Sequence, residues 1–136
     1  MLYDFIIKNF ILNTLFLISI IALIIFELNE IIQAKNSITP EKAVELINHE
    51  NAILIDTRIE KEFKQYHIIN SINIPSISKS EYILKKYKKK TIIIIHNKNK
   101  TAKKITSDLI KLNIKTVYIR NGINAWIKNK LPIKKK

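Results

Sequence analysis

The N-terminal part of the chain contains one long apolar stretch, over residues 10–26. Its polar residues are Asn13, Thr14 and Ser19. They form no polar face at helical spacing, so a helix here would be apolar on every side, unlike a helix on the surface of a globular core. With the apolar residues 5–7 added, the stretch approaches the roughly 20 residues that a membrane-spanning helix needs. We predict a transmembrane helix over about residues 5–27.

A cleaved signal peptide is the alternative explanation of this stretch. A signal peptide has a shorter apolar region and small residues before its cleavage point. The best candidate for that point is Ala34, but Ile32 stands where a second small residue is needed. We therefore expect residues 1–35 to be an uncleaved anchor with a short linker, and residues 10–26 to contact the lipid bilayer.

The charges around the apolar stretch determine its orientation only weakly. Lys8 precedes it, and Lys35 and Lys42 follow it among several glutamates. Lysines deep in a long domain contribute little to orientation, and a short N-terminal tail crosses a membrane readily. We expect a single-pass membrane protein with its soluble domain in the cytoplasm and another membrane protein as a candidate partner.

Residues 36–136 alternate short apolar runs with helical segments. Thr39 and Pro40 suit a helix N-cap and first turn. Further helical segments are predicted at 60–66, 80–87 and 101–112 and from Gly122, and strands at 52–55, 71–75, 91–95 and 116–119. This alternation predicts an α/β domain with a mainly parallel central sheet flanked by helices. In such sheets ligands bind beyond the carboxyl ends of the strands.

Composition excludes several kinds of chemistry. The chain has 136 residues, no cysteine and one glycine. Without cysteine it has no disulfide, no cysteine-based zinc or iron–sulfur site and no thiolate nucleophile. With one glycine it has no glycine-rich phosphate loop. We expect no cofactor and no metal site.

The net charge of +13 divides into −1 on residues 1–35 and +14 on residues 36–136. Lysine supplies almost all of the positive charge, whereas nucleic-acid readers favour arginine. Lysine, isoleucine and asparagine make up half the chain, and all three are encoded by A/T-rich codons. We expect general attraction to anionic surfaces but no specific nucleic acid partner. The lysine runs at 88–90 and 134–136 are predicted to be solvated surface.

Four motifs occur in a recognisable order between residues 39 and 133. They are Asp56-x-Arg58, then Glu62-Phe63 with His67-Ile68, then Asn73-Ile74-Pro75, then Val117-Tyr118 with Gly122, Ala125-Trp126 and Leu131-Pro132. In this order they resemble a rhodanese-like domain, and a membrane anchor before a single such domain is similar to the YibN-type bacterial proteins. The resemblance implies a location in the bacterial inner membrane. Two glycines of the family pattern are replaced by Asn70 and Asn121. Asparagine tolerates positive φ better than most residues, so we expect the fold to survive both changes.

The resemblance implies a sulfurtransferase loop that opens with a cysteine directly after the central strand. Aligned from the strand, His96 takes that position, and aligned from the following helix, Ile95 takes it. We therefore expect no catalytic residue and a binding or accessory role at the membrane. The alternative is a sulfurtransferase, or another group-transfer enzyme, that uses His96 as a base or nucleophile.

The remaining site residues fall into two predicted groups. The candidates for weak anion binding in the loop are His96, Asn97, Lys98, Asn99, Lys100 and Thr101. The predicted structural network is Asp56, Arg58 and His67, because a strand-terminal carboxylate can pair with a nearby guanidinium.

Overall fold

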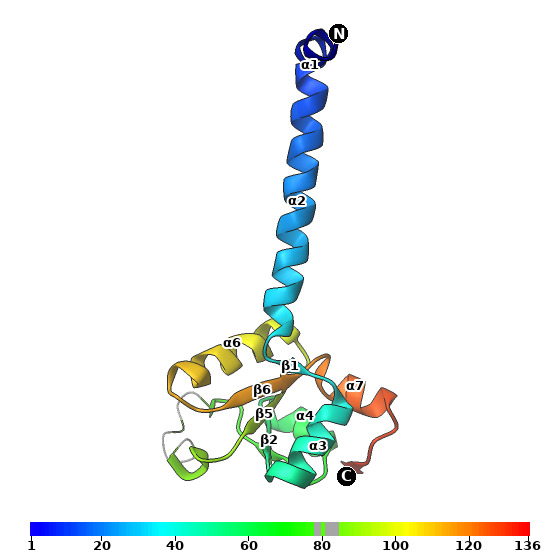
Figure 1. Ribbon diagram of the computed structural model, residues 1–136. Helices are drawn as coiled ribbons and strands as arrows, with labels where there is room; N and C mark the ends of the chain where they lie inside the picture. Colours follow the sequence, from blue (N-terminus) through cyan, green and yellow to red (C-terminus); the bar gives the residue numbers. More distant parts are fainter. Residues whose placement is uncertain (78–79, 81–84) are drawn as a thin grey trace. The chain divides into compact units, whose positions relative to one another are not determined.

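The computed structural model describes residues 1–77, 80 and 85–136, and these form two compact units, Met1–Lys35 and Asn36–Lys136 (Figure 1). We describe each unit separately. Of the helix predicted at residues 80–87, residues 81–84 lie outside the described residues, and residues 85–87 are helical.

The N-terminal unit contains two helices, α1 (Leu2–Lys8) and α2 (Phe10–Ala34). The segment Phe10–Asn29 is long and apolar enough to cross a membrane. The predicted span of about residues 5–27 contains a break, because the chain leaves helical geometry at Asn9, with φ −111° and ψ 31°. The Asn9 backbone N–H and its side-chain amide both donate to the carbonyl of Phe5.

The C-terminal unit is built on a parallel sheet, which confirms the predicted fold class. Within the described residues its strand order is β1-β6-β5-β2-β4. The strands are β1 (Ser37–Ile38), β2 (Ile53–Asp56), β4 (Ile72–Asn73), β5 (Ile92–Ile95) and β6 (Thr116–Ile119). Strand β5 lies at the centre and is fully buried, as expected from a continuous run of β-branched residues.

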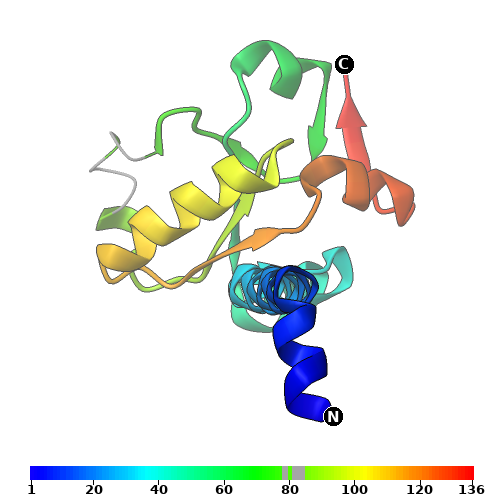
Figure 2. The same cartoon turned by 90° about the horizontal axis from the view of Figure 1, so that it is seen from above.

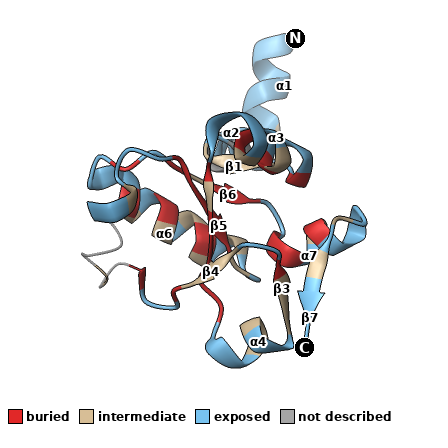
Figure 3. Cartoon of the chain, turned by 90° about the horizontal axis from the view of Figure 1, so that it is seen from below, coloured by how far each residue is buried: buried red, intermediate tan, exposed pale blue. Residues whose placement is uncertain are grey.

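Helices cover both faces of this sheet (Figure 2). On one face α3 (Pro40–Glu50) and α7 (Gly122–Lys128) pack against Ile93 and Ile95 of β5. On the other face α6 (Asn99–Lys111) packs against Ile92 and Ile94. Side chains of a strand alternate between faces, so β5 supplies both cores, and the buried positions concentrate along it in Figure 3. Helix α3 is capped as predicted, since the Thr39 side chain accepts from the Lys42 N–H.

A second, smaller sheet joins two distant parts of the unit. Helix α4 (Glu60–Gln65) leads into β3 (Tyr66–Ile68), which pairs antiparallel with β7 (Ile133–Lys135). The prediction that residues 134–136 are only solvated surface was incomplete. The lysine side chains are exposed, but the backbone of Lys134 and Lys135 belongs to strand β7. The hydropathy pattern does not predict this strand, because its lysine side chains are polar.

Asparagine occupies the left-handed turns, as the sequence led us to expect. Asn70 has φ 64° and Asn121 has φ 60°. Asn51 and Asn113 also lie in this region. Asparagine accepts this conformation because its short side chain can bond locally, so replacing glycine at residues 70 and 121 preserves the turns.

The Thr106 hydroxyl generates a stability prediction. This side chain is buried, and its oxygen has no hydrogen-bond partner among the described residues. A buried hydroxyl without a partner is destabilising relative to a methyl group. Thr106→Val should therefore raise the free energy of unfolding by about 1 kcal/mol, measured by urea denaturation of the full chain in detergent with Trp126 fluorescence.

Thr116 provides the matched control for this prediction. It is equally buried, but its hydroxyl donates to the carbonyl of Ile114 at 3.0 Å. Thr116→Val should lower the free energy of unfolding by about 1 kcal/mol. Destabilisation of similar size in both variants would contradict the assignment of Thr106 as unsatisfied.

Candidate functional site

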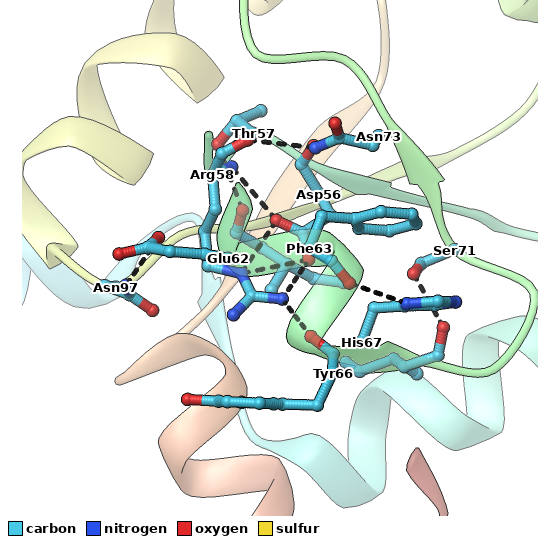
Figure 4. A network of polar contacts seen from close by, with 12 residues as sticks. Asp56, Thr57, Arg58, Glu62, Phe63, Tyr66, His67, Ser71, Asn73 and Asn97 are labelled. Carbon is cyan, nitrogen blue, oxygen red and sulfur yellow. Dashed lines mark hydrogen bonds and ion pairs between the residues drawn. The ribbon is translucent and has the colours of Figure 1, made fainter. Parts of the chain in front are cut away.

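A buried ion pair lies at the carboxyl end of β2. Asp56 and Arg58 are 0% and 2% exposed. The Arg58 Nη2 lies 2.8 Å from Asp56 Oδ2, and its Nε lies 3.0 and 3.1 Å from the two carboxylate oxygens. The Arg58 backbone N–H also donates to Asp56 Oδ1 at 3.0 Å. The planar guanidinium fork thus meets the carboxylate with several bonds at once (Figure 4).

The pair is connected to two further strands. Arg58 Nη2 donates to the Tyr66 carbonyl at 2.8 Å, and the guanidinium lies 5.3 Å from the centre of the Tyr66 ring. The Asn73 side-chain amide donates to the backbone carbonyls of Asp56 and Arg58, at 3.1 and 2.9 Å. The turn after β2 therefore holds the start of β3 and the end of β4.

His67 joins this region through α4 and β3 rather than through the ion pair. Its ring is stacked on that of Phe63, with centroids 4.0 Å apart, and its Nδ1–H donates to the Phe63 carbonyl at 2.8 Å. From the same helix, Glu62 reaches the loop after β5, where its Oε2 accepts from the Asn97 side-chain amide at 3.2 Å (Figure 4). Helix α4 thus connects the network to that loop.

His96 is the first residue after β5, and it is half-buried. Its Nδ1 accepts the Lys98 backbone N–H at 3.0 Å. An accepting Nδ1 is unprotonated, so the ring is neutral and carries its proton on Nε2. Burial lowers the pKa of His96, which also favours the neutral ring.

The backbone of this loop is held against α7. A Cβ atom on Gly122 would lie 2.1 Å from the His96 carbonyl oxygen, so only glycine allows this approach. Asn99 and Asn121 bond reciprocally: Asn99 Oδ1 accepts the Asn121 N–H at 2.8 Å, and Asn99 Nδ2 donates to Asn121 Oδ1 at 2.9 Å. Residues at both ends of the loop are therefore fixed.

The anion-binding candidates are brought together, but several have other contacts. Helix α6 begins at Asn99, and its N-cap residue Lys98 makes no side-chain cap bond. Asn97 and Asn99 bond to other side chains, and the Lys98 N–H bonds to His96. What remains is the positive end of α6 with the exposed Lys98 and Lys100 beside it, and binding of an anion there stays a prediction. Within the described part of the chain no group of three His, Cys, Asp or Glu residues could hold a metal ion.

Two pockets differ in their relation to the loop. An apolar pocket of about 380 Å³ lies at the amino end of β2, beside Val44, Ile47 and Trp126. A pocket of about 340 Å³ adjoins the loop itself and is lined by Asn97, Asn121, Asn124, Ala125 and Lys128. The second is smaller but lies at the carboxyl end of the sheet, where ligands of parallel α/β domains bind. Sequence patterns did not indicate Asn124 or Lys128, which approach the loop only through folding.

Comparison with known proteins agrees with this architecture. The pattern of the family described as "Rhodanese-like domain" matches residues 39–129. An uncharacterized protein of Buchnera aphidicola subsp. Baizongia pistaciae (strain Bp) is 34% identical over 128 residues, covering 89% of this chain and 87% of that protein. The uncharacterized protein YibN of Escherichia coli (strain K12) is 26% identical over 134 residues, covering 96% and 94%. Coverage this high includes most of the N-terminal unit.

Solved structures show the same fold. A rhodanese-related protein from Thermoplasma volcanium superposes with a TM-score of 0.61 at 26% identity, covering 73% of this chain and 97% of that one. A thiosulfate sulfurtransferase from Pseudomonas aeruginosa superposes with a TM-score of 0.63 at 20% identity, covering 80% of this chain and 22% of that one.

Because only Arg58 belongs to the buried ion pair, replacing it should change the free energy of unfolding more than replacing Arg120, the other arginine of the chain. Arg58→Lys should lower the free energy of unfolding by about 2–4 kcal/mol, because an ammonium cannot reproduce the fork of bonds and leaves the buried carboxylate poorly paired. Arg120 is exposed and donates to Ser37 Oγ at 3.1 Å. Arg120→Lys should change the value by less than about 0.5 kcal/mol. Equal effects in urea denaturation would refute the structural role of the pair.

The lowered pKa of His96 predicts a dependence of stability on pH. As the pH falls, the unfolded chain protonates His96 near its ordinary value of about 6.5, before the folded chain does. Stability should therefore fall from about pH 6.5 down to the folded-state pKa, with no loss from this group above that range. NMR titration of the full chain should place the His96 transition below that of a peptide histidine.

His96→Asn provides the control for this titration. An asparagine oxygen can accept the Lys98 N–H in the same kind of local turn, but it does not titrate. The variant should lose the part of the pH dependence that His96 causes, while its stability at pH 8 stays close to that of the natural chain. An unchanged slope of unfolding free energy between pH 5 and 7 would contradict the assignment.

Proposed function

The chain belongs to the rhodanese-like domain family, and we propose that it is a membrane-tethered binding module that does not transfer sulfur. The proposal rests on the identity of the residue that directly follows the central strand β5, which is His96. The family's reaction needs a thiolate there, and the chain contains no cysteine at any position.

The geometry of the loop supports this proposal. In active relatives the backbone N–H groups of the loop stabilise the sulfur anion, whereas here one of them, that of Lys98, is bonded to the His96 imidazole. The side chain that follows β5 thus satisfies a donor that a persulfide would otherwise use. The loop therefore keeps a defined shape without a sulfur atom.

The binding surface we propose is the loop side of the domain. The pocket there is lined by amides of Asn97, Asn121 and Asn124, with Lys128 beside them. Amides donate and accept hydrogen bonds, and a single cation adds attraction for carboxylates. This chemistry fits a polar or acidic segment of a protein, and we propose another membrane protein as the partner rather than a specific nucleic acid.

The tether we propose is α2. Its segment Phe10–Asn29 has the length and composition of a single span, and on this proposal it holds the domain at the cytoplasmic face of the bacterial inner membrane. Tethering confines the domain and its partner to the same surface, so weak contacts at the loop suffice for association.

Catalysis by His96 is the alternative, and its hydrogen bonding disfavours it. A general base or nucleophile needs a free lone pair on the imidazole. The lone pair of the neutral His96 ring is on Nδ1 and is engaged by Lys98, while Nε2 carries the proton.

Sulfur transfer from thiosulfate to cyanide tests the proposal. The full chain, purified in detergent, should form no thiocyanate above the buffer rate and should gain no sulfur mass after incubation with thiosulfate. His96→Ala should behave identically, and an unrelated cysteine-containing rhodanese-like protein in the same detergent confirms that the assay works. Turnover by the natural chain that disappears in His96→Ala would establish the enzymatic alternative.

A further inference from the structure

The break between α1 and α2 is the one irregular point in the apolar N-terminal unit. Figures 1 and 2 show α1 lying across the end of α2 rather than continuing its axis. Such a break frees the last carbonyl groups of the first helix from their usual partners. In a bilayer these carbonyls must be bonded within the protein, because hydrocarbon offers no donors.

Two asparagine side chains donate to carbonyls at this break. The Asn13 Nδ2 donates to the carbonyl of Ile6 at 3.0 Å, and the Asn9 Nδ2 donates at 2.9 Å to the carbonyl of Phe5, which also accepts the Asn9 backbone N–H at 3.1 Å. The second bond spans seven residues and joins the first turn of α2 to the last turn of α1. Asn13 therefore bonds a carbonyl across the break, Asn9 adds a second donor to the carbonyl of Phe5, and both bonds favour an angle between the two helices.

The other polar side chains of the stretch behave differently. Thr14 Oγ1 donates to the Ile11 carbonyl at 2.8 Å, and Ser19 Oγ donates to the Phe16 carbonyl at 2.7 Å. Both bonds lie within α2 and reach back three residues, as is ordinary for hydroxyls in a helix. They satisfy the hydroxyl groups without bending the chain, so Asn9 and Asn13 have a distinct role.

Helix α1 has the side-chain distribution of a helix at a membrane surface. Asp4 and Lys8 are four residues apart and share one side, Leu2 and Ile6 lie on the opposite side, and Phe5 lies between the two sides. All five side chains are exposed. The 20 residues of Phe10–Asn29 already span a hydrocarbon core of about 30 Å. A collinear α1 would therefore extend its apolar side into water.

We infer that Leu2–Lys8 lies in the plane of the membrane, with its apolar side in the headgroup–hydrocarbon boundary of a phospholipid bilayer and Asn9 and Asn13 fixing its angle to α2. This inference rests on the proposed tether. It assigns α1 a lipid surface as its partner and fixes Phe10 as the first residue of the span.

Depth measurements with single cysteines test the inference directly, because the natural chain has no cysteine to remove. Phe5→Cys and Lys8→Cys, each spin-labelled in the full chain in phosphatidylethanolamine–phosphatidylglycerol vesicles, are compared by oxygen and nickel-chelate accessibility. An in-plane helix with Ile6 facing the hydrocarbon places the label at residue 5 deeper than the label at residue 8 by about 4 Å, somewhat less than one helix radius. A label deeper at residue 8 than at residue 5, or both labels in water, would overturn the inference.

Variants of the polar side chains test what fixes the angle. Asn9→Leu with Asn13→Leu removes both amides, so α1 should straighten onto α2 and the label at residue 8 should become the deeper one. Thr14→Val with Ser19→Ala removes the two hydroxyls and should leave the original order of depths. If the asparagine double variant keeps that order, the asparagines do not hold the angle.

A carbonate wash of membranes separates this inference from the proposed tether. The full chain should stay in the membrane pellet. A chain released by carbonate would overturn the tether and with it the surface role of α1. A chain that stays in the pellet while depth increases steadily from residue 5 to residue 8 would preserve the tether and overturn the in-plane helix alone.

Discussion

The architecture of the C-terminal unit depends on the buried pair of Asp56 and Arg58. Net stabilisation by a buried ion pair is modest, because desolvation of both charges offsets most of their attraction. Each charge nevertheless requires its bonds, and these are made only when the turn after β2 and the Tyr66 carbonyl are in place. The Asn73 amide bonds the backbone carbonyls of the same turn and so ties β4 to it. The pair therefore acts mainly as a geometric constraint on the ends of three strands.

The loop after β5 is held by contacts that do not involve a sulfur atom. Thr57 bonds twice to the Ile95 carbonyl, through its backbone N–H and its hydroxyl, and so fixes the end of β5 beside the ion pair. Beyond it, Gly122 admits the His96 carbonyl, and Asn99 bonds to Asn121. Loss of a thiol at the strand end would remove the chemistry and leave these contacts unchanged. This is why a rhodanese-like scaffold without cysteine can still present a defined surface.

The sequence predicted those features whose cause is local or periodic. The run Ile92–Ile95 predicts a buried strand, Thr39 predicts a helix start, and a rare arginine at residue 58 indicates a specific use of its planar fork. Strand β7 could not be predicted, because its lysines resemble solvated surface and its pairing with β3 is long-range. Asn99 and Asn121 are 22 residues apart, so their bonds follow from the fold, which brings the start of α6 and the residue before α7 together at the carboxyl end of the sheet. The break at Asn9 was not predicted, because a single polar residue hardly changes the mean hydropathy of the apolar stretch.

Asparagine stands at residues 70 and 121, where the family pattern has glycine, and at both positions the fold has room for its side chain. Four asparagines of the chain adopt positive φ, at some cost in conformational energy relative to glycine. At residue 121 that cost is offset, since the Asn121 side chain gains a hydrogen bond to Asn99 that glycine could not make. At residue 122 glycine cannot be replaced in this way, because any Cβ would collide with the His96 carbonyl. The single glycine thus stands where α7 lies too close to the His96 carbonyl for any side chain, so a substitution there would have to move the loop.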